Sequence, residues 1–297
     1  MKKLNKLTAV LLSLALCLGM VAPAFAASLD DLQDAINGGS GDTEENKIDD
    51  GYYGYGENAN NTEGNGWDIW AKDNDDGGRD IELKGDVTHE ETDKTDTIIV
   101  DDKVNIDLND NNITGDGEHT VIKVEEGGDL TIENGTISNN PSNAETPAEG
   151  ANGIDVEGDL TLDGVTIKDT DTAVNVEEGG TAEIEGSTIT DNNTGVAFED
   201  SDSVTFIGDQ NLVNNNKKDI DGSGRVNFTL TDEDGKETTY KVDAETAETL
   251  LADKDKIAAH GTDWILTKND GDAYTVVYTG HGGWSRKSWP LQKRRPG

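Results

Sequence analysis

Residues 122–140 read IKVEEGGDLTIENGTISNN, and residues 174–192 read VNVEEGGTAEIEGSTITDN. In both stretches the apolar residues stand at positions 1, 3, 9, 11 and 16, with Gly, Asp, Asn, Glu and Thr prominent between them. Apolar residues that alternate with polar ones are typical of short strands with one buried face. Gly, Asp and Asn favour sharp turns between such strands. The spacing therefore predicts a repeated unit of three short strands joined by tight turns.

Copies of this unit can be followed from residue 98 to residue 230. They begin at residues 98, 122, 154, 174, 196 and 220, mostly 20 to 24 residues apart. The third copy lacks two residues of its first turn, and the fifth places its last inward residue, Leu212, one position late. The first copy is predicted to keep the full spacing with Ile98, Val100, Ile106, Leu108 and Ile113 as its inward residues.

One such unit cannot bury its own apolar stripe, so successive units are expected to stack as a solenoid. A leucine-rich repeat has a similar length but requires an Asn in a Leu-rich consensus, which this sequence lacks. Three strands per unit instead predict an all-β solenoid, a right-handed parallel β-helix. We expect about six to seven coils, with a short N-terminal capping helix and a small α+β C-terminal cap.

Five segments resemble the pectin-lyase-like superfamily, notably its repeat-containing secreted and surface proteins of bacteria. These segments are DIELKGDVT (80–88), VNIDLNDNNITG (104–115), GDLTIENGTISNN (128–140), GDLTLDGVTIKDT (158–170) and AEIEGSTITDN (182–192). The resemblance covers roughly half of the chain and implies the fold. It implies no single activity, because this fold hosts lyases, hydrolases, adhesins and inert scaffolds.

The first 26 residues have the pattern of a signal peptide. Three lysines precede an apolar run over residues 7–21, and Ala24-Phe25-Ala26 offers a cleavage site between small residues. The sequence thus predicts a secreted, extracellular bacterial protein, with association to the cell surface as an option. Cys17, the only cysteine, lies inside this segment, so the mature chain would have no disulfide. No later apolar run is long enough to span a bilayer.

Four further segments follow the predicted signal peptide. Residues 27–80 are expected to hold a helix capped by Ser28 and a loop rich in Gly, Asn and Asp. Residues 81–224 are expected to form the β-helix, with a bulging insertion at 140–150. Residues 225–279 predict an α+β module with two hairpins around a helix at 244–251, and residues 280–297 predict a disordered basic tail.

The formal net charge of −38 restricts the partners of this chain. Such a surface repels nucleic acid and anionic membranes, so neither is an expected partner. An extracellular glycan, or another component of a host or cell surface, is the class of partner that remains.

No catalytic residue is predicted. The resemblance implies that a lyase of this fold would need a basic residue beside an acidic, calcium-holding cluster. Arg79 and Arg225 lie near the two ends of the stack, and Lys123 and Lys168, on middle coils, are not grouped with such acids. A hydrolase would need two carboxyl groups roughly 5 to 10 Å apart, and the Gly-His-Gly at 280–282 falls beyond the last coil.

Stacked acids are the remaining option for catalysis. Glu125, Glu157 and Glu177 follow the first strand of their copies, so they should lie about 4.8 Å apart and raise one another's pKa. A hydrated ladder of carboxylates is the favoured interpretation, and a functional dyad is the alternative.

Aromatic residues provide the predicted ligand-binding site. The candidates are Tyr52, Tyr53, Tyr55, Trp67 and Trp70, which could form a platform that stacks on sugars. For the two tryptophans, apolar packing against the first coil is the favoured interpretation.

Two Asp-rich turns are candidate calcium sites. Asp219, Asp221, Ser223 and Gly224 fit the start of a D-x-D-x-S-G loop, but Leu230 occupies the twelfth position, where an acid is needed. Asp73 and Asp75 precede Gly77-Gly78 in a second oxygen-rich turn. The alternative is ordinary turn chemistry, and no other cofactor is predicted.

Two polar columns are expected along the stack. One column should face outward and contain Thr136, Thr166 and Thr188. The other should stack equivalent turn residues of successive coils, Asn139, Asp169, Asp191 and Asn214. Such ladders are expected to satisfy backbone groups. The sequence as a whole predicts a non-catalytic β-helix scaffold or adhesin that binds glycans, with a polysaccharide lyase or glycoside hydrolase as the alternative.

Overall fold

The computed structural model describes the chain from residue 26 to residue 278, with gaps. The gaps are residues 39–40, 49–50, 58–65, 91–92, 141–146, 209, 232–234, 236, 253–263 and 269–273. Nearly all of the predicted signal peptide, the basic tail at 280–297 and most of the insertion at 140–150 therefore lie outside the described residues.

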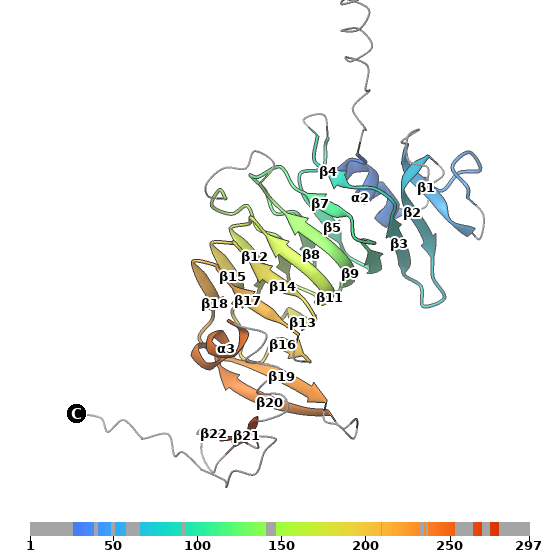
Figure 1. The fold of residues 1–297 in the computed structure, drawn as a ribbon. Coiled ribbons are helices and arrows are strands. Elements are labelled where there is room, and N and C mark those ends of the chain that lie inside the picture. The colour runs from blue at the N-terminus through green and yellow to red at the C-terminus, as the bar shows by residue number, and fades with distance from the viewer. Residues whose placement is uncertain are drawn as a thin grey trace, which may run out of the picture.

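Most of the described chain is a stack of coils that run between two sheets (Figure 1). The first strand of each coil belongs to a six-stranded sheet: β5 (Ile98–Val100), β8 (Ile122–Val124), β10 (Ile154–Val156), β12 (Thr172–Val176), β15 (Thr194–Phe198) and β18 (Lys218–Asp221). The second strand belongs to a fourteen-stranded sheet: β3 (Arg79–Leu83), β6 (Lys103–Asp107), β9 (Asp129–Ser138), β11 (Asp159–Lys168), β13 (Thr181–Glu185), β16 (Val204–Ile207) and β19 (Arg225–Thr231).

The third strand of each coil bends away from the second but stays in the large sheet. It is formed by β4 (Val87–Thr88), β7 (Asn112–Thr114), the ends of β9 and β11, β14 (Thr188–Thr190) and β17 (Leu212–Asn214). All pairings between successive coils are parallel, and Ile122, Ile154 and Val174 align in one fully buried row. The predicted solenoid of three-stranded coils is confirmed.

The spacing predicted for the first coil is wrong by two residues. Val104 pairs with Leu130 and Ile106 with Ile132, so the first turn of this coil is two residues shorter than in the second coil. The second turn is two residues longer, and Leu108 is fully buried within it, close against Gly135 of the next coil. The stack tolerates this exchange because the third strands return to register, where Ile113 pairs with Ile137.

The inward residue of the fifth coil is Val213 and not Leu212. Val213 pairs with Ile189 and is 1% exposed, whereas Leu212 pairs with Thr188 on the outer side of the sheet. A strand places successive side chains on opposite faces, so a shift of one residue exchanges the buried and the outer position.

The predicted threonine column is confirmed, and the predicted turn column is only partly correct. Thr166 pairs with both Thr136 and Thr188. In the turn that follows, Asp169 and Asp191 share a left-handed conformation with Asn215, at φ of 56°, 61° and 58°. Asn214 instead ends strand β17, and Asn139 is fully buried with its amide bonded to loop backbone.

Both ends of the stack are covered (Figure 1). At the N-terminal end lies the amphipathic helix α2 (Leu29–Asn37), which begins at the predicted Ser28 in a capping box with Asp31 and buries Leu29 and Leu32. Beside it β2 (Trp67–Asp73) pairs antiparallel with β3, and β1 (Tyr53–Glu57) pairs antiparallel with β2, so both strands extend the large sheet.

The C-terminal end has the predicted order of elements. Strand β20 (Glu237–Asp243) pairs antiparallel with β19, and helix α3 (Ala244–Leu251) follows directly. Helix α3 buries Ala247 and Leu251, and the Glu248 side chain accepts a hydrogen bond from the backbone N–H of Ile220 at 3.2 Å. Strands β21 (Trp264–Lys268) and β22 (Tyr274–Tyr278) form the second hairpin. Among the described residues, no helix is both long and apolar enough to cross a membrane.

Candidate functional site

A hollow of about 390 Å³ lies over the outer face of the large sheet near its N-terminal end. We call it the N-terminal hollow. It is lined by Tyr52, Asp80, Ile81, Glu82, Asn105, Ile106, Asp107, Thr131 and Glu133. One aromatic ring thus stands beside carboxylate, amide and hydroxyl groups from three neighbouring strands, which is the mixture of groups that polar ligand sites use.

The acidic floor of the hollow results from strand register. Glu82 pairs with Asp107, and Asp107 pairs with Glu133, so one outward position of β3, β6 and β9 carries an acid each time. The same column continues beyond the hollow with Asp163 and Glu185. Because parallel strands lie about 4.8 Å apart, these carboxylates form a ladder along the sheet.

A second polar column completes the floor. Asp80 accepts hydrogen bonds at 2.9 Å from the side-chain amides of Asn74 and Asn105. Partial burial acts to raise the pKa of Asp80, but these two hydrogen bonds and the charge of Lys72 outweigh it, so the pKa is lowered. Asp80 is therefore held as a carboxylate that can accept hydrogen bonds from a ligand.

Two of the five predicted aromatic residues, Tyr52 and Trp70, lie together, and Tyr52 lines this hollow. The rings of Tyr52 and Trp70 are 5.8 Å apart and tilted by 49°. The Lys72 ammonium lies 4.4 Å from the centre of the Tyr52 ring, and the Lys84 ammonium lies 4.5 Å from that of Trp70. Lys84 also forms an ion pair with Glu82. Cation–π contacts of this kind help to hold both rings in place.

The other three predicted aromatic residues have packing roles. Tyr55 is 6% exposed, and its hydroxyl donates a hydrogen bond to Asp42 at 2.5 Å. Burial and the contact with Asp42 raise the pKa of Tyr55. Tyr53 is half-buried against the core, and the Trp67 ring covers Gly54, where an added Cβ would lie 2.3 Å from it.

Three of the residues predicted to bind calcium, Asp219, Asp221 and Asp73, are engaged by protein donors. Asp219 accepts hydrogen bonds from the backbone and side chain of Asn216, and Asp221 bonds to Lys218 at 2.6 Å. In the other turn Asp73 forms an ion pair with Arg79 at 2.9 Å. Ser223 and Asp75 are exposed. Calcium at these turns stays a prediction.

The cations considered for lyase chemistry are all ion-paired. Arg79 lies 2.8 Å from Asp42 at the N-terminal end, and Arg225 lies 3.0 Å from Asp202 at the C-terminal end. On the middle coils, Lys123 lies 2.9 Å from Glu157, and Lys168 lies 3.8 Å from Asp169. The pairing with Glu157 raises the pKa of Lys123, so this side chain stays protonated at neutral pH and has no lone pair with which to take a proton.

One of the stacked glutamates, Glu177, has a raised pKa, as the predicted spacing of these side chains suggests. Partial burial raises the pKa of Glu177, and the neighbouring charges of Asp155 and Glu157 raise it further. Lys123 acts in the opposite direction but does not cancel the effect.

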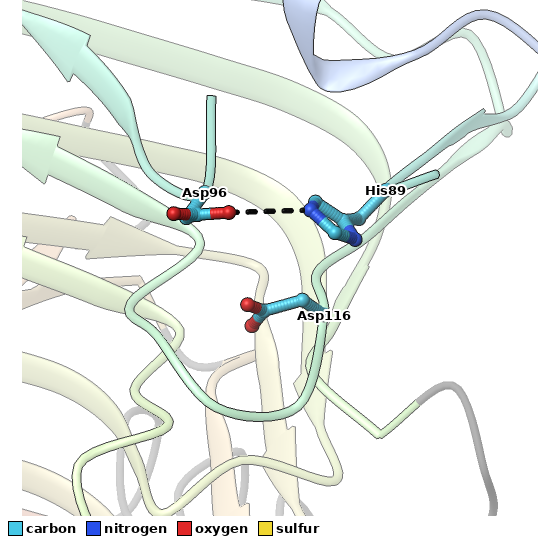
Figure 2. A group of neighbouring side chains, drawn as sticks. All are labelled: His89, Asp96 and Asp116. Atoms are coloured by element: carbon cyan, nitrogen blue, oxygen red, sulfur yellow. Dashed lines mark ion pairs between the residues drawn. The ribbon is translucent and has the colours of Figure 1, made fainter. Parts of the chain in front are cut away.

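Sequence reasoning missed a second group of polar side chains, His89, Asp96 and Asp116 (Figure 2). They lie at the corner of the first two coils, where the third strands lead into the six-stranded sheet. One ligand atom from each side chain lies within 4.8 Å of the others. Because Thr88 pairs with Thr114, the residues after these strands lie side by side. The matching places of His89 and Asp116, each shortly after a paired third strand, are the signal by which the sequence could have revealed the group.

Residues 96–232 match the family model described as the right handed beta helix region. Together with the parallel register of the coils, this match shows that this part of the chain is a right-handed parallel β-helix. Comparisons with curated proteins and with solved structures found no significant match.

Proposed function

We propose that this protein is a secreted or cell-surface β-helix scaffold, without catalytic activity, that binds an extracellular glycan in the N-terminal hollow. The observation that carries the proposal is the placement of the Tyr52 ring beside the Asp80 carboxylate and the ladder of Glu82, Asp107 and Glu133. An aromatic face packs against the C–H face of a sugar, while carboxylate and amide oxygens accept hydrogen bonds from its hydroxyl groups.

The charge of the hollow narrows the ligand class. Four acidic residues line it, and a chain of net charge −38 surrounds it. A polyanionic glycan would be repelled, whereas a neutral glycan or one with amino groups would be accepted. The sequence pattern at residues 1–26 supports export to a place where such glycans occur.

The ion pairs support a non-catalytic role over the lyase and hydrolase alternatives. Arg79 and Arg225 are bound to carboxylates at opposite ends of the stack, and Lys123 is held by Glu157. A lyase needs a base that is free to take a proton. The stacked carboxylates repeat along several coils, whereas a hydrolase needs one acid and one partner with separate roles.

The test uses the full mature chain and a panel of immobilised glycans. The panel should contain neutral, amino-substituted and uronic acid polymers, and binding should be measured alongside reducing ends and unsaturated products. We expect binding to neutral or amino-substituted glycans and no product formation. Turnover of any polymer would defeat the scaffold proposal.

Matched variants locate the binding. Tyr52→Ala and Glu133→Gln should weaken binding, because both side chains line the hollow. Glu185→Gln is the control, since Glu185 belongs to the same acidic column but lies outside the hollow. Equal binding by Glu133→Gln and Glu185→Gln, with all variants folded, would remove the hollow as the site.

A further inference from the structure

The corner between the first two coils brings together one imidazole and two carboxylates from two loops. His89 follows β4, Asp96 precedes β5, and Asp116 lies between β7 and β8. The Nε2 atom of His89 lies 3.4 Å from Oδ1 of Asp96, and Asp116 faces the same space (Figure 2).

The imidazole of His89 is unsatisfied in this position. Its side chain is 15% exposed, and within the described part of the chain its Nε2 atom is buried without a hydrogen-bond partner. The approach to Asp96 is an ion-pair contact that lacks hydrogen-bond geometry. Burying a polar nitrogen without a partner is unfavourable, and a metal ion bound to that nitrogen would remove the penalty.

We propose that His89, Asp96 and Asp116 bind one divalent transition-metal ion of the Zn²⁺ class. Neutral imidazole together with carboxylate oxygens suits Zn²⁺ and its neighbours in the first transition row, whereas Ca²⁺ and Mg²⁺ prefer sites made only of oxygen. Water would fill the remaining positions.

Only a small adjustment is needed to close the site. Metal–ligand distances of about 2.0 to 2.2 Å place tetrahedral ligand atoms roughly 3.4 Å apart, and the present atoms lie within 4.8 Å of one another. Asp96 can supply the movement, because its side chain is 52% exposed. A hollow of about 570 Å³ borders the corner, because Asp96 and His119 are among its lining residues.

His119 orients one of the proposed ligands. Its Nδ1 atom lies 2.5 Å from Oδ2 of Asp116, and Oδ1 of Asp116 accepts hydrogen bonds at 2.8 Å from the backbone N–H groups of Glu118 and His119. Oδ1 thereby uses both of its lone pairs, whereas Oδ2 keeps one lone pair for a metal ion. Partners of this kind hold a ligating side chain in a fixed direction.

The bound ion would connect the first two coils and the N-terminal cap. The segment that carries Asp96 already holds helix α2, because Asp30 accepts hydrogen bonds from the backbone N–H groups of Lys94 and Thr95. A link from Asp96 to Asp116 would fasten this segment to the second coil. Metal binding should therefore stabilise the folded protein by linkage.

The experiment measures binding of Zn²⁺ and Co²⁺ to the full mature chain after removal of metal with a chelator. We expect one equivalent of Zn²⁺ by calorimetry, a visible Co²⁺ spectrum of low coordination number, and a melting temperature that rises with Zn²⁺. His89→Gln and Asp96→Asn should each weaken Zn²⁺ binding about tenfold or more. Glu118→Gln is the matched control, because the exposed Glu118 side chain lies on the loop of Asp116 and only its backbone N–H contacts that ligand. It should change the affinity less than about threefold.

Asp96→Asn separates loss of metal binding from loss of folding, because an exposed side chain is replaced by one of the same shape. Its melting temperature without metal should equal that of the parent chain. The proposal is overturned if the parent chain binds no stoichiometric Zn²⁺, or if Asp96→Asn and Glu118→Gln weaken binding equally. The second result would indicate diffuse binding by the acidic surface.

Discussion

The replacement of Asn192 by alanine tests how the turns of the β-helix are held together. Asn192 is 3% exposed, and its side-chain amide links its own coil to the coils before and after it. Its Oδ1 atom accepts hydrogen bonds from the backbone N–H and the hydroxyl of Thr170, at 3.0 and 2.9 Å. Its Nδ2 atom donates to the carbonyl of Ile167 at 3.2 Å and to Oδ1 of Asn216 at 2.9 Å.

Alanine at position 192 removes the acceptor for the backbone N–H and the hydroxyl of Thr170. Thr170 is fully buried, so water cannot replace that acceptor. An unsatisfied buried polar group costs about 1 to 3 kcal/mol. With the lost bond to the Ile167 carbonyl included, we expect Asn192→Ala to lower the free energy of unfolding by about 3 kcal/mol.

Urea denaturation followed by circular dichroism measures this change. Asn175→Ala is the matched control, because the Asn175 amide makes an outward hydrogen bond to Asp155 at 3.2 Å. That variant should lose about 0.5 kcal/mol. If the two variants are destabilised equally, the buried amides do not carry the turn and our reasoning is wrong.

Three further outcomes can be measured by denaturation. Burial and neighbouring carboxylates raise the pKa of Glu177 in the folded state, so wild-type stability falls as the pH rises from the ordinary glutamate pKa of about 4.3 through the folded pKa. Glu177→Gln should therefore be more stable than the wild type at pH 7 by less than about 1 kcal/mol. If the urea midpoints of the two proteins differ as much at pH 3.5 as at pH 7, this explanation is wrong. Burial opposes the lowering of the pKa of Asp202, but two neighbouring cations outweigh it. The stability that ionised Asp202 contributes to the fold should thus be present above about pH 3.9 and be lost as the pH falls below it. Asp202→Asn should cost about 1 kcal/mol at pH 7 and nothing in acid, as checked by urea unfolding across this range. Val213→Ala should cost about 2 kcal/mol and Leu212→Ala about 0.5 kcal/mol by urea unfolding at neutral pH, and the reverse order would refute the assignment of the inward residue.

The repeat could be predicted because it depends on local chemistry. Alternating apolar residues define strands, Gly, Asp and Asn define turns, and stacking follows from the constant length of the unit. The capping helix that begins at Ser28 and the helix Ala244–Leu251 were predictable for the same reason. The errors at Leu108 and Leu212 arose where a turn changed length, since a strand buries alternate residues and the spacing alone does not show which turn has changed.

The candidate sites were less predictable because they depend on contacts between coils. The sequence indicated aromatic residues between 52 and 70, but strand pairing decided that the Tyr52 ring meets Trp70 and lines the hollow, whereas Tyr55 is buried. His89 and Asp116 are far apart in the chain and were not recognised.

The sequence by itself determined the unit of three strands, the two caps and the strong negative charge, since each depends on residue type and spacing along the chain. Only the tertiary structure decided which polar groups share a surface. The register between coils places Glu82, Asp107 and Glu133 in one column, and it brings the loops of His89, Asp96 and Asp116 to one corner. Register is set by the length of every intervening turn, so it is a property of the assembled stack.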